Sequence, residues 1–179
     1  FQNYLSSLIL FAADIPVYEV TKFYDINDQI LYRNYHQFRN IIYNKYIMEM
    51  QRKPLSFHVQ IDESLFSKRK YERGRKKPQT WVFGACDDQC GGRVYMVIVP
   101  KRNEDTLLPI IQSWCPQGSI VNSDCWAAYR NIENFGYAHC TVNHSENFVD
   151  PDTNEHTQRI EGLWHQAKLF MQTHCYNKS

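Results

Sequence analysis

The order of the predicted strands and helices is the feature that most constrains the fold of this 179-residue chain. Five apolar or alternating runs predict strands, and the first three follow one another without a helix between them. The five runs are 57–62, 80–86, 93–100, 119–123 and 138–142. A helix is expected at 104–114, capped by Asn103, and another at about 125–134. This order predicts an α/β domain with a mixed sheet and flanking helices.

The first 50 residues predict a separate helical module. Apolar residues recur at helical spacing from residue 2 onward, Pro16 suits the first turn of a second helix, and a third helix is expected from about 28 to 50. Pro54, preceded by three polar residues, indicates a linker. Because the chain begins at Phe1 within a predicted helix, we expect the module, residues 1–50, to be truncated and the chain to be a fragment of a longer protein.

The arrangement of helix, short turn and helix indicates that this module is helix-turn-helix-like and binds DNA. The later helix would enter a groove with Arg33 near the contact surface, beside Gln29, Tyr32 and His36. The alternative is a helical bundle that only packs on the next domain, because the later helix carries no cluster of basic residues.

The formal net charge is only +1, but the cations are unevenly distributed. Seven of the ten residues from 68 to 77 are basic: Lys68, Arg69, Lys70, Arg73, Arg75, Lys76 and Lys77. A loop of this kind between the first two strands would neutralise several DNA phosphates by counterion release. A nuclear-targeting signal and a solvated charge run are the competing interpretations.

Two aspartates follow predicted strands. Asp62 ends the alternating run 57–62, in which the odd positions are apolar and would face a core while the even positions face the other way. Asp124 follows the short run 119–123. Because ligand sites of open α/β sheets collect at the carboxyl ends of strands, we expect both carboxylates at one site.

A third acid, Glu161, lies in a predicted helix from about 156 to 173. The apolar stripe of this helix is Ile160, Trp164, Ala167 and Met171, and the adjoining face carries Gln158, Glu161, His165 and Lys168. A helix that buries that stripe against the sheet would bring Glu161 to Asp62 and Asp124, and three carboxylates suit Mg²⁺ or Mn²⁺. The alternative is that these acids are exposed to solvent or cap helices, which is the case for most Asp and Glu residues.

The residues around each acid carry a resemblance to a known family. The three segments are Val59-Gln60-Ile61-Asp62-Glu63-Ser64, Asn122-Ser123-Asp124-Cys125-Trp126-Ala127-Ala128-Tyr129 and His156-Thr157-Gln158-Arg159-Ile160-Glu161-Gly162-Leu163-Trp164. With further segments in the same order (68–71, 74–75, 81–84, 99–100, 142–145 and 148–151), they resemble DDE transposases of the Merlin superfamily and related bacterial insertion-sequence transposases. The resemblance covers roughly residues 55 to 173. Gln158 and Arg159 depart from it, since relatives often carry Asn and Thr there.

The resemblance implies a ribonuclease H-like catalytic domain at 55–175, with Asp62, Asp124 and Glu161 as its catalytic triad. It implies that these acids bind two Mg²⁺ or Mn²⁺ ions about 4 Å apart. The activity would be cleavage of DNA phosphodiesters and strand transfer, in which water first frees a 3′-hydroxyl and that hydroxyl then attacks target DNA. Transposon terminal inverted repeats, target DNA and further copies in a homo-oligomer would be the partners. The protein would act in the nucleus of a eukaryote, or in the cytoplasm and nucleoid of a bacterium.

Histidines and tryptophans near the acids have smaller expected roles. His144 and His156 flank the loop before the last helix, and His165 lies one turn beyond Glu161. We expect His156 and His165 to be hydrogen-bond partners around the site, able to orient a phosphate or a water. Trp126 and Trp164 are expected to be core residues of their helices.

Composition excludes several protein classes. With 43% hydrophobic residues the chain is not a disordered protein, and the apolar stretch 5–13 is too short to span a bilayer, which takes about 20 residues. The six cysteines are expected to be reduced. Cys86 and Cys90 have a spacing found in zinc sites, but the Gly91-Gly92 pair after them favours a hairpin.

Three functions fit these residues. The first is a cut-and-paste transposase. A domesticated, non-catalytic DNA-binding protein that keeps the fold is the second, and a ribonuclease H-like nuclease that cuts without joining is the third. The same three metal ligands serve cleavage and joining, so they do not distinguish a nuclease from a transposase.

Overall fold

The computed structural model describes residues 2–66, 79–88, 92–142 and 157–174, and the chain divides into two compact units. One unit comprises residues 1–49 with residues 170–179, and the other comprises residues 50–169. No helix among the described residues combines the length and the apolar character that crossing a bilayer requires.

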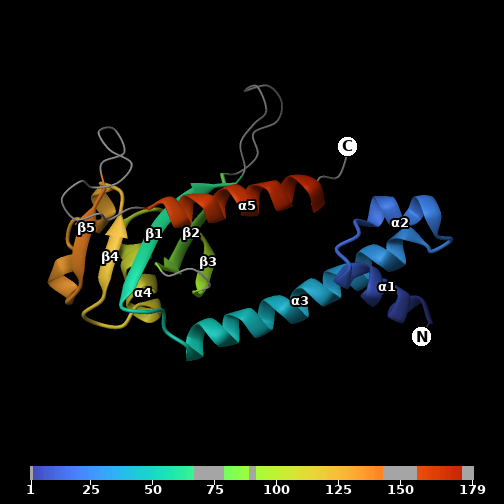
Figure 1. Ribbon diagram of the computed structural model, residues 1–179, viewed down its shortest axis with the longest axis horizontal. Helices are drawn as coiled ribbons and strands as arrows, with labels where there is room; N and C mark the ends of the chain where they lie inside the picture. The colour runs from blue at the N-terminus through green and yellow to red at the C-terminus, as the bar shows by residue number, and fades with distance from the viewer. Residues whose placement is uncertain (1, 67–78, 89–91, 143–156, 175–179) are drawn as a thin grey trace, which may run out of the picture. The chain divides into compact units, whose positions relative to one another are not determined.

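Three helices form the amino-terminal part, as the sequence predicts: α1 (Gln2–Ala12), α2 (Val17–Phe23) and α3 (Asp28–Arg52) (Figure 1). The side chain of Asn27 caps the start of α3, because its Oδ1 accepts a hydrogen bond of 2.9 Å from the backbone N–H of Gln29. The helices share a buried apolar cluster: Leu10, Val17, Val20, Leu31, Tyr35 and Phe38. This part of the chain therefore has its own small core.

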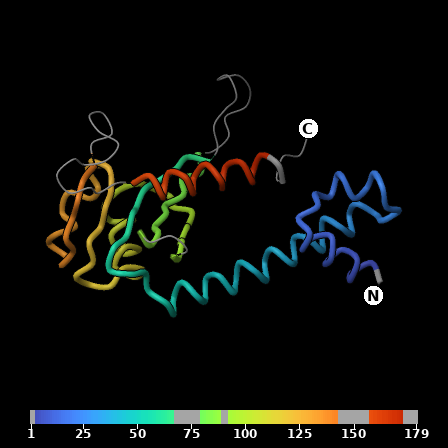
Figure 2. The backbone as a smooth tube through the Cα atoms, in the orientation of Figure 1, coloured from blue at the N-terminus to red at the C-terminus, as the bar shows by residue number. Residues whose placement is uncertain are grey.

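The second unit contains a five-stranded mixed sheet (Figures 1 and 2). Its strands are β1 (His58–Leu65), β2 (Trp81–Asp87), β3 (Val94–Val99), β4 (Ile120–Ser123) and β5 (Ala138–Thr141), arranged in the order β3-β2-β1-β4-β5. β1, β2 and β3 pair antiparallel, whereas β4 pairs parallel with both β1 and β5. This is the ribonuclease H-like strand order, so the predicted fold class is confirmed.

Helices cover both faces of the sheet. Phe83 on β2 stacks on Trp114 of α4 (Glu104–Trp114), with 5.5 Å between ring centroids. The next residue, Gly84, lies against Trp164 of α5 (Gln158–His174). Since neighbouring residues of a strand face opposite sides, α4 and α5 lie on opposite faces.

Two details predicted for β1 are wrong. Asp62 does not end the strand: β1 continues to Leu65 and pairs with β2 along this length, with Asp62 opposite Gly84. Phe57 lies outside the strand and is 58% exposed, so it does not face the core. The parallel pairing with β4 involves only His58–Gln60 of β1, so β1 runs on past the end of β4.

The helix predicted at about 125–134 is wrong. Two short 3-10 helices replace it, η2 (Ala127–Tyr129) and η3 (Ile132–Phe135). Side chains of this segment form bonds to other elements, since Trp126 Nε1 donates to the carbonyl of Arg102 (3.1 Å) and Asn131 donates to Glu104 (3.0 Å). These bonds favour tight turns over a regular helix. Trp126 is consequently 39% exposed and is not the core residue predicted.

The cysteines at 86, 115, 125 and 140 are free thiols, as expected of a reduced protein. β2 and β3 are antiparallel neighbours, as the hairpin interpretation of the Cys86 segment requires. Cys90, Gly91 and Cys175 lie outside the described residues.

Candidate active site

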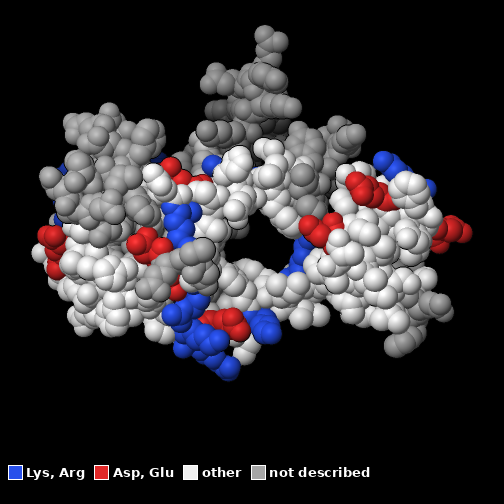
Figure 3. Space-filling model, in the orientation of Figure 1, with Lys and Arg blue, Asp and Glu red and all other residues white. Residues whose placement is uncertain are grey.

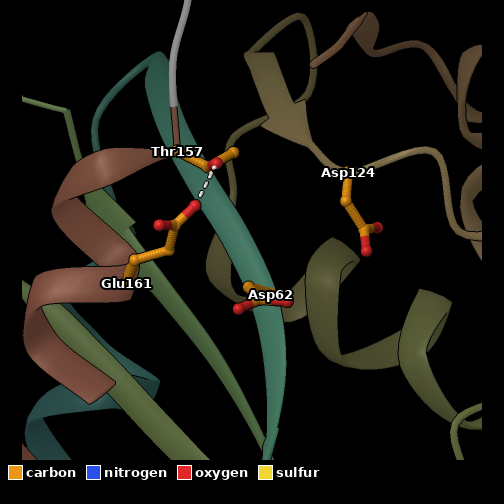
Figure 4. Close-up of a pocket in the computed structure, with 4 residues that line it drawn as sticks. All are labelled: Asp62, Asp124, Thr157 and Glu161. Atoms are coloured by element: carbon orange, nitrogen blue, oxygen red, sulfur yellow. Dashed lines mark hydrogen bonds between the residues drawn. The ribbon is translucent and has the colours of Figure 1, made fainter. Parts of the chain in front are cut away.

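The three acids singled out in the sequence line one pocket. Asp62, Asp124, Glu161 and Thr157 surround a cavity of about 210 Å³. Figure 4 shows Asp62 on β1, Glu161 on α5, and Asp124 across from them beyond the end of β4. Residues separated by as many as 99 positions in the chain therefore lie around one space.

The strand lengths explain this arrangement. β4 ends at Ser123, one residue before Asp124, while β1 continues past its last pairing with β4 at Gln60. Asp62 therefore lies on the part of β1 that no longer pairs with β4. The pocket lies beside this part of β1, where the chain leaves β4. Glu161 is in the first turn of α5, which covers the sheet face to which Asp62 points.

Asp62 is held by the core of the unit. Its Oδ2 accepts a hydrogen bond of 2.8 Å from Nε1 of Trp164, a residue that is only 4% exposed. The pKa of Asp62 is raised to about 6, chiefly by burial and in addition by the negative charges of Asp124 and Glu161. Hydrogen bonds from the Glu63 backbone and Trp164 partly offset this increase. The pocket therefore disfavours uncompensated negative charge and favours a cation.

Glu161 is held at the start of α5. The Thr157 hydroxyl, in the N-cap position, donates a hydrogen bond of 3.0 Å to Oε1 of Glu161 (Figure 4). The helix itself is fixed to β1, because the Oε1 of Gln60, a fully buried side chain, accepts from the backbone N–H of Ile160 at 3.1 Å. That bond satisfies one of the N–H groups that a helix leaves unpaired in its first turn.

Asp124 is fixed by the turn that follows β4. Its Oδ1 accepts a hydrogen bond of 3.0 Å from the backbone N–H of Trp126. The Ser123 hydroxyl donates to the carbonyl of Asp124 (2.7 Å) and lies 2.8 Å from Nε2 of His139. With its one proton used, that hydroxyl accepts from His139, which therefore carries its proton on Nε2. Burial lowers the pKa of His139, in keeping with a neutral ring.

Residues 47–175 match the ISXO2-like transposase domain family, and this match covers well over half of the chain. The chain belongs to this family. A relative in Haemophilus influenzae, described as an uncharacterized transposase-like protein, is 32% identical over 80 residues. The aligned segment is 45% of this chain and 63% of the relative, so the chain spans less than two thirds of that relative's length.

The donor chemistry of this transposase domain fits a divalent metal. Among the described residues, no three His, Cys, Asp or Glu side chains stand close enough to form a ready-made metal centre. The three carboxylates instead line an open pocket. Mg²⁺ retains several water ligands and commonly takes only one or two carboxylates, so such a pocket suits it. The raised pKa of Asp62 also favours a metal, because a bound cation would offset the unfavourable burial of the negative charge of Asp62.

The transposase domain contains a further acid that the sequence analysis did not single out. Oε1 of Glu63 accepts a hydrogen bond of 2.5 Å from the hydroxyl of Tyr129, which is 1% exposed. Burial raises the pKa of Glu63 to about 7, although the Tyr129 bond lowers it. Glu63 follows Asp62 on a strand and so faces the opposite side of the sheet. No feature of the sequence indicates its partner.

Thr157 and Trp164 also have roles that sequence reasoning missed. Trp164 is a core residue, as predicted, but its indole nitrogen is also bonded to Asp62. The only signal for Thr157 in the sequence is that Thr is favoured at the position before a helix, and this does not indicate its bond to Glu161.

Other predicted site residues lie away from the pocket or outside the described residues. Arg33 is exposed on α3, where Gln29, Tyr32 and His36 are exposed on the same helix face. His165 is exposed on α5 and does not line the pocket. The basic run from Lys68 to Lys77, His144 and His156 lie outside the described residues.

Proposed function

We propose that this chain is the catalytic part of a DNA transposase that cleaves phosphodiesters and transfers DNA strands with a divalent metal. The observation that carries this proposal is the convergence of Asp62, Asp124 and Glu161 from three separate elements on one pocket. Membership of a transposase domain family supports it.

In this proposal Asp62, Asp124 and Glu161 hold two Mg²⁺ or Mn²⁺ ions. When bound, such ions supply activation of an attacking oxygen and stabilisation of the leaving oxygen. The chain's own contribution is to fix the ligands, with Trp164 bonded to Asp62, Thr157 bonded to Glu161, and the backbone of Trp126 bonded to Asp124. Three rigid attachments keep the carboxylates in place around the pocket.

We further propose that residues 55–175 form the catalytic domain and that residues 1–50 form a DNA-binding module, in which Arg33 contacts the transposon ends. The basic run from Lys68 to Lys77 contacts the DNA backbone, and His156 and His165 assist in orienting the reacting groups. The family origin is the Merlin superfamily and its bacterial relatives. The protein pairs two DNA ends as a homo-oligomer, in whichever compartment holds the DNA of its host.

The test is cleavage and joining of supercoiled and oligonucleotide DNA with Mg²⁺ or Mn²⁺. We expect activity in the unaltered chain and its loss in Asp62→Asn, Asp124→Asn and Glu161→Gln. Asp105→Asn is the matched control, because this exposed acid on α4 does not line the pocket. Cleavage without joined products would instead indicate a nuclease. DNA binding with no cleavage under any metal would indicate a domesticated protein.

A further inference from the structure

Arg102 lies against two tryptophans beside the pocket. The centre of its guanidinium is 3.7 Å from the ring centroid of Trp81 and 4.6 Å from that of Trp126. Trp126 is fixed in turn, because its Nε1 donates to the backbone carbonyl of Arg102 at 3.1 Å. A guanidinium stacked on aromatic rings loses much of its rotational freedom, so Arg102 is held in one orientation.

The donor groups of Arg102 are not used within the described part of the chain. There, the guanidinium donates no hydrogen bond and forms no ion pair, and its contacts are the two aromatic rings. Both rings lie close to the central carbon of the guanidinium, whereas its five N–H donors point outward in its own plane. An immobilised fork of N–H donors suits a phosphate, which accepts two parallel hydrogen bonds from it.

Arg102 is linked to one of the pocket acids through Trp126. The backbone N–H of Trp126 donates to Oδ1 of Asp124, so one tryptophan contacts both Arg102 and a pocket acid. The positive charge of Arg102 also acts on the carboxylate of Glu63, which faces the opposite side of the sheet from Asp62. Trp126 is therefore the residue that connects the guanidinium to the pocket.

Figure 3 shows Lys and Arg side chains in groups among Asp and Glu on the face drawn. Phosphate contacts set the register of DNA on a protein, so a single cation held in a fixed orientation can position a DNA strand.

We propose that Arg102, held by Trp81 and Trp126, binds a backbone phosphate of the DNA strand that enters the pocket. This inference rests on the proposed function, since it places DNA at the same site. Arg102 is thus a DNA-binding residue in addition to Arg33 and the basic run. A purely structural Trp-Arg-Trp stack is the competing explanation, and it predicts no direct effect on DNA affinity.

The experiment measures binding of the full chain to a labelled 20-base-pair duplex by fluorescence anisotropy. EDTA is present so that binding is measured apart from cleavage, and the KCl concentration is varied. The variants are Arg102→Gln, Arg102→Lys and Trp126→Ala. Lys101→Gln is the matched control, because Lys101 is an exposed neighbouring cation and the cation–π contacts of the described residues to Trp81 and Trp126 come from Arg102. Thermal unfolding of each variant shows that it is folded.

Arg102→Gln should weaken binding about tenfold and reduce the slope of log K against log [KCl] by about 0.9, the value for one lost phosphate contact. Arg102→Lys should also weaken binding several-fold, because lysine keeps the charge but not the planar fork. Trp126→Ala should weaken binding although no charge is lost, and Lys101→Gln should have a much smaller effect than Arg102→Gln.

Three results would overturn the inference: unaltered binding in Arg102→Gln, wild-type binding in Arg102→Lys, or equal losses in Arg102→Gln and Lys101→Gln. Either of the last two results would mean that Arg102 acts on DNA only through general electrostatic attraction. Failure of the proposed function is a separate result, because it appears as absent cleavage by the unaltered chain when Mg²⁺ replaces EDTA. Binding that depends on Arg102 would survive that failure.

Discussion

The indole nitrogen of Trp164 donates a hydrogen bond of 2.8 Å to Oδ2 of Asp62. Trp164 belongs to the buried cluster between α5 and the sheet, together with Ile160 and Cys86. Packing of this core therefore sets the position of one of the three pocket acids. A substitution in the core can alter the site without touching any carboxylate.

Trp164→Phe should retain most of the packing and remove the hydrogen bond to Asp62. We expect a loss of about tenfold in metal-dependent cleavage, the lower end of the effect of removing an outer partner of a metal ligand. Trp114→Phe is the matched control, since Trp114 is equally buried on the opposite face and its indole contacts Phe83 and Tyr95, with no pocket acid. Equal activity losses in the two variants would show that general packing, and not the Asp62 bond, is responsible.

Gly84→Ala should displace Trp164. A Cβ at position 84 would lie 2.5 Å from Cη2 of Trp164, far inside van der Waals contact. We expect a decrease in the free energy of unfolding of about 1–3 kcal/mol, the usual cost of overpacking. Gly162→Ala on α5 is the control, because no atom lies within 4 Å of a Cβ there, and it should stabilise the helix by about 0.5–1 kcal/mol. Urea denaturation measures both changes.

A double variant tests the cause of the Gly84 effect. In a Trp164→Leu background the smaller side chain leaves room for a Cβ at position 84, so Gly84→Ala should cost less than it does alone. If the losses of the two single variants simply add in the double variant, the strain caused by Gly84→Ala does not arise from contact with Trp164.

The sequence predicts the local elements well because their signals are local. Periodicity gives α4 at its observed bounds and the five strands to within a few residues, and motif context indicates Asp62, Asp124 and Glu161. The contact between Gly84 and Trp164 joins positions 80 residues apart, and periodicity shows only that such residues are buried. A glycine inside a strand does indicate a close approach, but not by which residue.

The segment after Asp124 was mispredicted for a related reason. Its apolar spacing at Trp126, Tyr129 and Ile132 fits a helix, yet bonds from its side chains to Arg102, Glu63 and Glu104 determine two 3-10 helices instead. Tertiary bonds override weak local propensity in so short a segment. The same bonds give Trp126 the exposed position from which it contacts Arg102.

Thr157→Val should weaken metal binding at the site. The substitution keeps the shape of the side chain but removes the hydroxyl that donates to Glu161. We expect the Mg²⁺ concentration for half-maximal cleavage to rise about tenfold, as for other outer partners of metal ligands. Thr157→Ser, which keeps the hydroxyl, should remain close to the unaltered chain. If Thr157→Ser shows the same rise, the lost methyl group is the cause and the hydrogen bond is not.

Asp87 should make the stability of the unit formed by residues 50–169 depend on pH. It is 5% exposed and accepts hydrogen bonds from the backbone N–H groups of Ser56 (2.5 Å) and Arg93 (2.8 Å). Burial favours the neutral carboxyl, but these bonds, with those from the Ser56 and Arg93 side chains, outweigh it and lower the pKa of Asp87. A folded-state pKa below the unfolded value, about 4, stabilises the protein above pH 4, and this contribution disappears as the pH falls through the folded-state pKa.

Asp87→Asn should therefore reduce the free energy of unfolding at pH 7 by about 1–3 kcal/mol, because an amide offers one acceptor oxygen in place of two charged ones. The difference from the unaltered chain should narrow below pH 4, where the carboxyl becomes protonated. Urea denaturation between pH 3 and pH 7 measures it, with Asp25→Asn as the control, since Asp25 is an exposed acid of the amino-terminal part. A difference that stays constant with pH would mean that the charge of Asp87 contributes nothing and that only the shape of its hydrogen-bonding group matters.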